Sequence, residues 1–203
     1  MKKSRLKPRK TPVQARSLEM DRYILTAAIR VLKKRGGLNF TTIHVAEEAG
    51  ISVGSLYQYY PNKEAILFRI QEAEWNDTWP KLDVILNSQE GTPWENMRSA
   101  VVAFFESEAE EAVLRSAVDQ AGAFFRDTPE YRKLREQVYS TTRRFLRGAL
   151  PQEKAAQLEF KTDFLVTALT SISESITSRG LRGKELAHWA DFTAEWLIQA
   201  MKS

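Results

Sequence analysis

The chain has 203 residues, a net charge of +4, 43% apolar residues and 28% charged residues, a balance typical of a globular protein with one or two domains. The absence of cysteine excludes disulfides, thiolate nucleophiles and cysteine metal sites, and two histidines are too few for a multi-histidine metal centre. No run of about 18 apolar residues is present, and no apolar stretch follows the basic start of the chain. We therefore expect a cytoplasmic protein without a membrane span, a secretory signal, a metal or a cofactor.

The charge is distributed unevenly along the chain. Residues 1–69 hold 14 Lys and Arg against 5 Asp and Glu, whereas residues 70–203 hold 16 against 21. A basic first third favours contact with a polyanion. The same charge also fits a soluble surface with a basic tail, so the motifs must decide between these interpretations.

Apolar residues recur at spacings of three and four, which predicts an all-α fold of about nine helices and no sheet. Gly36 and Gly37 are expected to end the first helix, and Pro80 to stop or kink the fourth. Thr92, Pro93 and Glu95 mark a later helix start. The expected helices span residues 21–35, 42–49, 52–60, 62–79, two within 94–125 that break near 110–111, 129–148, 153–178 and 184–201.

Two short helices joined by a turn that contains Gly50 are typical of a helix-turn-helix. Apolar and small residues are expected on the inward side, namely Ile43, Ala46, Ala49, Ile51 and Leu56. The outward positions of residues 53–59 carry no acidic side chain, as a helix that enters a DNA groove requires.

The stretch TTIHVAEEAGISVGSLYQYYPNKE, residues 41–64, resembles the DNA-binding domain of the TetR family of transcriptional repressors. Nearly every position fits the family pattern, in which a His is common at the position of Tyr59 and a Phe at that of Tyr60. With the first helix, the resemblance covers roughly the first 70 residues. It implies a basic arm at 1–15, a DNA-binding domain at 16–65 with its helix-turn-helix at 41–60, and an effector-binding and dimerisation domain at 66–203.

The resemblance implies that a set of residues in the second to fourth helices contacts DNA, and it places Tyr60 inside. These residues are Thr41, Thr42, Ser52, Val53, Gly54, Ser55, Tyr57, Gln58, Tyr59 and Lys63. The Gln58 amide suits bidentate recognition of adenine. Other interpretations remain open: a threonine as a helix cap, Tyr57 as a core residue, Gly54 at a crowded helix crossing, Gln58 as a solvated side chain, and the basic arm as a solubilising tail rather than a minor-groove contact.

The resemblance also implies a cavity for a small effector in the second domain, which is rich in aromatic residues. The candidate effector-binding residues are Trp75, Trp94, Phe104, Asp119, Phe124, Tyr139 and Arg143. Aromatic walls and a few polar anchors are typical of ligand pockets, although any single ring also fits an ordinary core.

The last two helices are expected to form a dimer interface, because their apolar residues follow a near-heptad spacing. The candidate interface residues are Leu165, Leu169, Ile172, Ile176, Ala190, Thr193 and Leu197. Trp189, Phe192 and Trp196 form a second apolar face on the final helix. Packing within a single chain is the competing interpretation.

These features predict a homodimeric repressor that binds a palindromic double-stranded DNA operator and is released by a small, largely apolar effector. The alternative is a DNA-binding architectural or partner-regulated factor without a small effector. An enzyme is disfavoured, because the sequence lacks the cysteines, the clustered histidines and the glycine-rich phosphate loop that common catalytic sites use.

Overall fold

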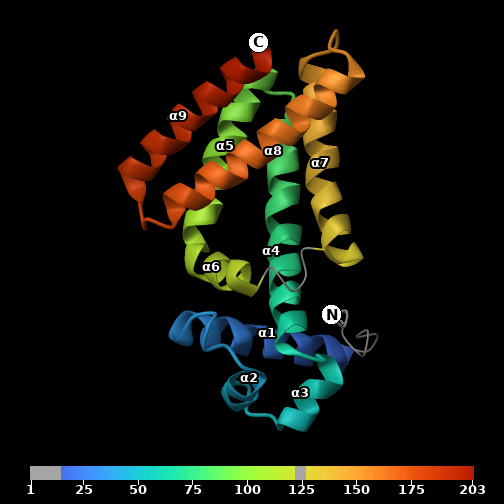
Figure 1. Cartoon of the computed structure of the whole chain (residues 1–203), viewed down its shortest axis with the longest axis vertical. Helices are drawn as coiled ribbons and strands as arrows, with labels where there is room; N and C mark the ends of the chain where they lie inside the picture. Colours follow the sequence, from blue (N-terminus) through green and yellow to red (C-terminus); the bar gives the residue numbers. More distant parts are fainter. Residues whose placement is uncertain (1–14, 122–126) are drawn as a thin grey trace. The chain divides into compact units, whose positions relative to one another are not determined.

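Nine α-helices and no strand are found in residues 15–121 and 127–203, the part of the chain that the computed structural model describes (Figure 1). The helices are α1 (Ala15–Arg35), α2 (Thr42–Glu48), α3 (Val53–Tyr59), α4 (Lys63–Leu86), α5 (Pro93–Glu110), α6 (Ala112–Ala121), α7 (Pro129–Ala149), α8 (Ala155–Thr177) and α9 (Gly183–Lys202). None of the helices in these ranges is long and apolar enough to cross a lipid bilayer. The predicted all-α fold is confirmed.

The local signals for helix ends act as expected. Gly36 follows α1 with a φ of 70°, a conformation that costs glycine little. At the start of α5, the Glu95 amide donates to the Thr92 hydroxyl at 3.3 Å, and the Thr92 amide donates to the Glu95 carboxylate at 2.7 Å. This reciprocal capping box satisfies two amides that the helix itself leaves without an acceptor.

Helix α4 continues past Pro80 to Leu86, so the prediction that it ends near Trp79 is wrong. Proline removes one intrahelical hydrogen bond, but tertiary packing on both sides of it compensates. Trp79 packs against Phe104 of α5 with 6.0 Å between ring centroids, and Leu82 is buried beside the same helix. The burial of this segment therefore outweighs the local preference to stop.

The chain forms two compact units. The first comprises the described residues up to 74 and those of 113–132, and the second comprises 75–112 and 133–203. This division differs from the boundary at 65/66 that the sequence suggested. The reason is that Ile66, Leu67 and Ile70 of α4 share a buried core with Leu114 and Val118 of α6.

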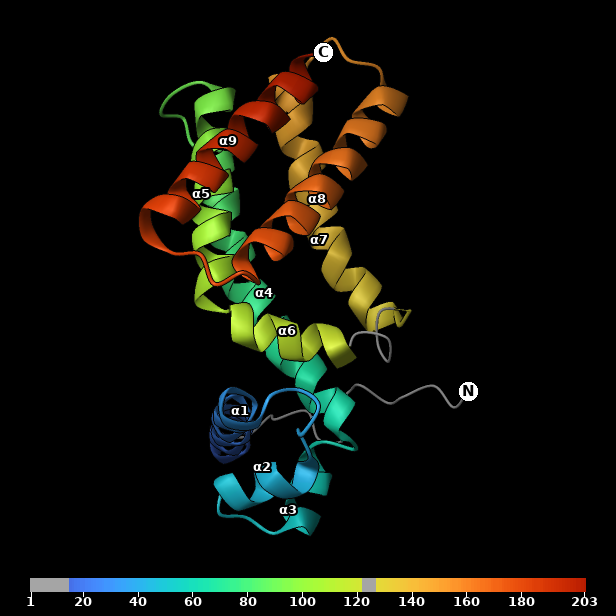
Figure 2. The same ribbon diagram turned by 60° about the vertical axis from the view of Figure 1, so that its left-hand side comes forward.

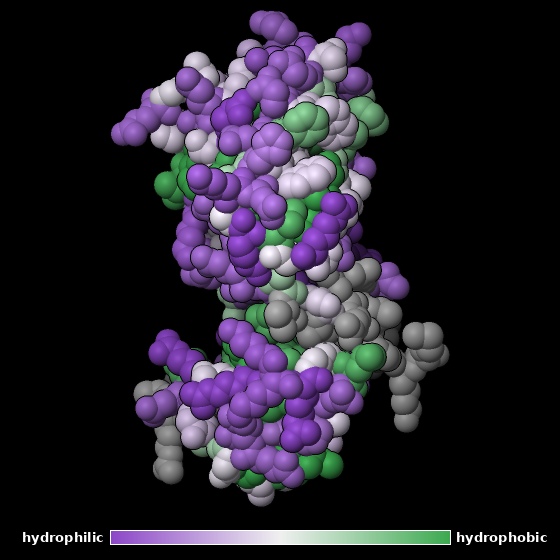
Figure 3. All heavy atoms as spheres, turned by 90° about the vertical axis from the view of Figure 1, so that its left-hand side faces the viewer, coloured by the Kyte–Doolittle hydropathy of each residue, from purple (hydrophilic) through white to green (hydrophobic). Residues whose placement is uncertain are grey.

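In the first unit, α1 packs against α2, and α2 against α3. Its core contains side chains with almost no exposed surface, among them Ile24, Leu32, Phe40, Leu56 and Tyr60. In the second unit, α9 packs along α5, and both contact α8 (Figure 2). On the faces that Figure 3 shows, hydrophilic residues predominate and hydrophobic residues reach the surface in patches.

A buried polar network joins three helices of the first unit. The Tyr60 hydroxyl, at the end of α3, donates a hydrogen bond to the Asp21 carboxylate of α1. Arg69 of α4 lies 3.8 Å from the other oxygen of Asp21. Burial, and then the hydrogen bond to Asp21, raise the pKa of the Tyr60 hydroxyl well above its ordinary value, so this group stays protonated and keeps donating.

We predict that Tyr60→Phe lowers the free energy of unfolding by about 1–3 kcal/mol, because it leaves the buried Asp21 carboxylate without its donor. Urea denaturation followed by circular dichroism measures the change. Tyr59→Phe is the matched control, since Tyr59 is only half-buried and should change the free energy by less than about 0.5 kcal/mol. Equal losses in the two variants would contradict a special role of the Tyr60–Asp21 bond.

Candidate DNA interface and effector cavity

The helix-turn-helix is built by short-range hydrogen bonds. The Thr41 hydroxyl accepts from the His44 amide at 3.2 Å at the start of α2, and the Ser52 hydroxyl accepts from the Ser55 amide at 3.0 Å at the start of α3. Between the helices, Gly50 has a φ of 60°. A glycine adopts this left-handed conformation without the strain that a Cβ adds, and the chain reverses direction here. Thr41 therefore caps α2, as the alternative interpretation of the two threonines allowed.

Helix α3 presents a polar surface without acidic residues. Gly54, Tyr57 and Gln58 are exposed, as is the cap Ser52. Four further candidate contacts are half-buried, namely Val53, Ser55, Tyr59 and, at the start of α4, Lys63. The surface therefore offers hydroxyl, amide and ammonium groups on neighbouring elements, which are the groups that proteins use on phosphates and base edges.

Tyr57 links the two helices of the motif instead of entering the core. Its ring is 39% exposed, and its hydroxyl lies 3.2 Å from the Thr42 hydroxyl of α2. Either hydroxyl can donate in this pair. The bond orients two candidate phosphate contacts toward the same side of the motif.

Gly54 has no structural need to be glycine. A Cβ built there would meet only the Ser52 hydroxyl oxygen, at an ordinary contact distance of 3.8 Å. The interpretation of a crowded helix crossing is therefore not supported. Close approach of an external molecule to this backbone remains as a reason for glycine at an exposed position of α3.

Ile43 was expected to pack inside, but it is 54% exposed, so that prediction is wrong. Its position is about 200° around the helix from Val45, which is buried with Ala46 and Ala49 on the inward face. The basic arm, residues 1–15, lies outside the described residues apart from the first helical position.

The second unit contains an apolar cavity, bounded by four helices. It holds about 500 Å³ of space free of protein atoms, part of it open to solvent. The lining residues are Trp79, Leu82 and Leu86 of α4, Met97, Ala100, Val101 and Phe104 of α5, Thr142 and Phe145 of α7, and Leu165, Val166, Leu169 and Thr170 of α8. Its apolar lining with few polar groups is typical of a site for a small organic ligand.

Of the predicted effector residues, Phe104 lines this cavity. Trp75 instead packs edge-on against Trp79, 6.5 Å between centroids, and Trp94 packs edge-on against Phe145 at 6.5 Å. Phe124 and the side chain of Asp119 lie outside the described residues. Sequence reasoning missed most of the wall, although the spacing of Trp79, Leu82 and Leu86 on one face of α4 was a usable signal.

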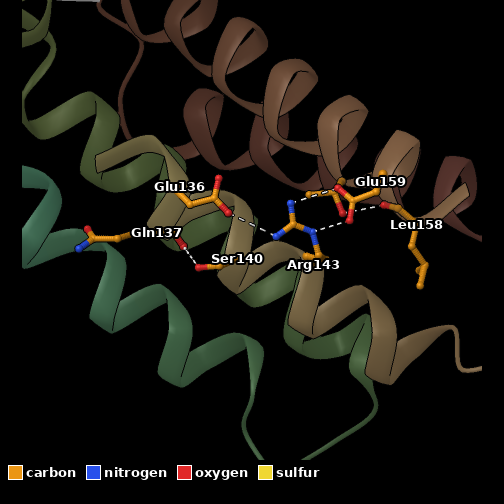
Figure 4. A network of polar contacts seen from close by, with 7 residues as sticks. Glu136, Gln137, Ser140, Arg143, Leu158 and Glu159 are labelled. Atoms are coloured by element: carbon orange, nitrogen blue, oxygen red, sulfur yellow. Dashed lines mark hydrogen bonds and ion pairs between the residues drawn. The ribbon is translucent and has the colours of Figure 1, made fainter. Parts of the chain in front are cut away.

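The two predicted polar anchors on α7 form ion pairs and hydrogen bonds instead of lining the cavity. The Arg143 guanidinium lies 2.6 Å from Glu159 of α8 and 3.4 Å from Glu136 (Figure 4), and the hydrogen bond with Glu159 raises the pKa of Arg143 further. The Tyr139 hydroxyl donates to Asp163 at 3.1 Å and accepts from Arg135 at 2.7 Å. These contacts connect α7 to α8. The wall of the cavity therefore contains no charged residue.

The predicted dimer residues point largely into their own subunit. Five of them are buried in the second unit: Leu165, Ile176, Ala190, Thr193 and Leu197. Leu169 and Ile172 are half-buried, and Leu165 and Leu169 line the cavity. Near-heptad spacing identifies an apolar stripe, but a helix with two apolar stripes can turn either one inward.

The outward stripe is aromatic. Phe160 and Phe192 are 63% and 64% exposed, and Trp196 and Trp189 are 47% and 37% exposed. Phe164 is half-buried, with its ring 6.4 Å from that of Phe160 and 5.8 Å from that of Trp196. We call these five residues of α8 and α9 the aromatic face.

Comparison with known proteins agrees with this geometry. Residues 24–70 match the model of the bacterial regulatory proteins of the tetR family. No curated protein sequence matches the chain. Among solved structures, a TetR-family transcriptional regulator from Pectobacterium atrosepticum superimposes with a TM-score of 0.70 at 18% identity, covering 93% of this chain and 95% of the other.

Two further structures share the fold and are repressors. SmeT, the repressor of the Stenotrophomonas maltophilia multidrug efflux pump SmeDEF, gives a TM-score of 0.67 at 19% identity, with 89% of each chain covered. Thermus thermophilus FadR, solved in complex with lauroyl-CoA, gives 0.66 at 21% identity, with 89% of this chain and 94% of the other covered.

A helix-turn-helix with an acid-free outer face is the arrangement with which DNA-binding proteins enter a major groove. The match over residues 24–70 identifies a tetR-type helix-turn-helix domain, and the likeness to the solved structures shows that the chain has a TetR-like fold.

We predict that Gly54→Ala weakens DNA binding without harming the fold. Alanine has a higher helix propensity than glycine, so the free energy of unfolding should rise by roughly 0.5–1 kcal/mol. The added methyl group stands between the backbone and DNA, so affinity should fall roughly tenfold, comparable to the loss of one base contact. Fluorescence anisotropy measures the DNA affinity, and thermal unfolding measures the stability.

Gly148→Ala is the control, because Gly148 is exposed in α7 with no atom within 4 Å of an added Cβ. It should stabilise the protein and leave DNA affinity unchanged, and a Gly54→Ala variant with full DNA affinity would contradict the prediction.

Proposed function

We propose that this protein is a ligand-responsive transcriptional repressor of the bacterial cytoplasm that binds a partly palindromic operator as a homodimer and is released by a small, largely apolar effector. One observation carries the proposal: a polar recognition helix in the first unit is combined with an apolar cavity in the second. A DNA-binding protein without a small ligand has no need of such a cavity.

The DNA half of the proposal rests on the surface of α3. This helix enters a major groove, where the exposed Gln58 amide reads an adenine. Thr42, Tyr57 and Lys63 contact phosphates, which fix the position of the helix on the duplex. The basic excess of residues 1–69 supplies long-range attraction to DNA.

The effector half rests on the cavity and on the relatives. A structure with the same fold is described as a complex of SmeT with triclosan, and another as a complex of FadR with lauroyl-CoA. An effector releases DNA only if it binds the two states of the protein with different affinity. Helix α4 carries Lys63 in the first unit and three cavity residues in the second, so it is the element through which we expect the two sites to communicate.

The dimer rests on the aromatic face. Rings as exposed as Phe160 and Phe192 are unfavourable in water, and burial of such a face against a second copy recovers the hydrophobic free energy. Thr167, Ser171 and Ser175 are exposed on the same helix and are small enough for a second helix to approach closely. Two copies related by a twofold axis then present two α3 helices to the half-sites of a palindrome.

Selection from a pool of random DNA duplexes should yield a partly palindromic site. The Gln58→Ala variant should bind this site about 1–3 kcal/mol more weakly than the wild type, and its preference for one base of the site should be relaxed. Affinity of the wild type should fall steeply with salt, because each neutralised phosphate contributes about −0.9 to the log–log slope. Gln137→Ala, in exposed α7, is the control and should change neither quantity. Equal weakening of Gln58→Ala on all sequences would show that Gln58 does not read a base. A flat salt dependence would contradict the DNA interface as a whole.

Sedimentation should show a wild-type dimer and a Phe192→Glu monomer, because the new carboxylate would be buried in the interface without a partner. Val84→Glu is the matched control: Val84 is an equally apolar, 74% exposed residue of α4, and this variant should remain a dimer. A Phe192→Glu protein that sediments as the wild type would place the interface away from the aromatic face.

A further inference from the structure

One polar group in the wall of the apolar cavity has no hydrogen-bond partner among the residues that the structure describes. Thr142 of α7 is 6% exposed, and its hydroxyl makes no hydrogen bond with another described residue. Three threonines of α8 behave differently. The hydroxyls of Thr162, Thr170 and Thr177 each donate to the carbonyl four residues earlier, at 2.7–2.8 Å.

This contrast gives Thr142 a particular capacity. In a threonine that donates to its own helix, the hydroxyl proton is already used in a hydrogen bond. The Thr142 hydroxyl, in contrast, can still donate one hydrogen bond and accept two. A ligand in the cavity can therefore form a hydrogen bond with this hydroxyl without breaking one between described residues. The group therefore favours a ligand with a polar atom at this position.

The rest of the wall limits what that polar atom can be. Apart from Thr142 and Thr170, every lining residue is apolar, and none carries a charge. Thr170 is exposed, so its part of the wall also reaches solvent. An ion placed deep in such a cavity loses its hydration without gaining a counter-charge, which is costly.

We propose that the cavity selects an uncharged molecule whose apolar body carries one hydroxyl or carbonyl oxygen, hydrogen-bonded to Thr142. This inference rests on the proposed function in taking the cavity as the effector site. The wall is apolar and the cavity is partly open to solvent, so we test it with ligands whose apolar body is two fused rings. Trp79, Phe104 and Phe145 provide the aromatic surface on which such rings pack.

Three probes of similar shape test the proposal by isothermal titration calorimetry on the full chain at pH 7. They are 1-naphthol, 1-methylnaphthalene, which lacks the oxygen, and 1-naphthoate, which is an anion. The wild type should bind 1-naphthol roughly two- to tenfold more tightly than 1-methylnaphthalene, the range that one net hydrogen bond supplies. It should bind 1-naphthoate most weakly. Failure of all three probes to bind at their solubility limits, or equal binding of the anion, would overturn the proposal.

Thr142→Val removes the hydroxyl and keeps the shape of the side chain. It should bind 1-methylnaphthalene as the wild type does and lose the preference for 1-naphthol, whereas Thr142→Ser should restore that preference. Thr170→Val is the matched control in the same wall, and its preference should be unchanged because the Thr170 hydroxyl already bonds to the backbone. A Thr142→Val protein, folded by circular dichroism, that still prefers 1-naphthol would refute the role of Thr142.

The same probes separate this inference from the proposed function when DNA release is measured independently. If 1-naphthol binds with a preference that depends on Thr142 and leaves DNA affinity unchanged, the ligand chemistry stands and effector-controlled release fails. If 1-naphthol releases DNA equally from the wild type and Thr142→Val, the proposed function stands and the inference fails.

Discussion

The buried hydrogen bond from Tyr60 to Asp21 holds together the part of the molecule that we expect to read DNA. Tyr60 directly follows α3, the proposed recognition helix. Asp21 belongs to α1, and Arg69 of α4 lies next to the Asp21 carboxylate. The recognition helix has only seven residues, too few to be stable alone, so its orientation depends on such tertiary contacts. Because the pair lies in an apolar core with Leu56 and Ile66, water does not compete for the hydrogen bond between Tyr60 and Asp21.

In the second unit, the division of apolar residues between two stripes of α8 and α9 determines the rest of the architecture. The inner stripe, with Leu165 and Leu197, fills the core and bounds the cavity, and the aromatic face remains on the surface. The same two helices therefore serve two roles with different residues. We expect a substitution on the inner stripe to affect folding and the cavity, and one on the aromatic face to affect the proposed assembly.

The polarity of the cavity follows from where the charged side chains of α7 are satisfied. Arg143 and Tyr139 bond to acidic residues of α8 outside the cavity wall, and they leave two threonine hydroxyls as its only polar side chains. An apolar ligand with a single oxygen fits this wall. A ligand with several charges would require a different set of partners on α7.

The sequence by itself determined the helix-turn-helix, because that motif is made of local interactions. The turn at Gly50, the caps at Thr41 and Ser52 and the small Ala46 lie within a dozen residues of one another, so one stretch of sequence encodes them. The tertiary structure alone decided which stripe of α9 faces inward, that Ile43 is exposed, that α4 continues through Pro80, and which residues of four helices meet at the cavity. Periodicity gives the position of a side chain around its own helix axis. It does not tell which neighbouring helix covers that position, because this depends on packing between segments far apart in the chain.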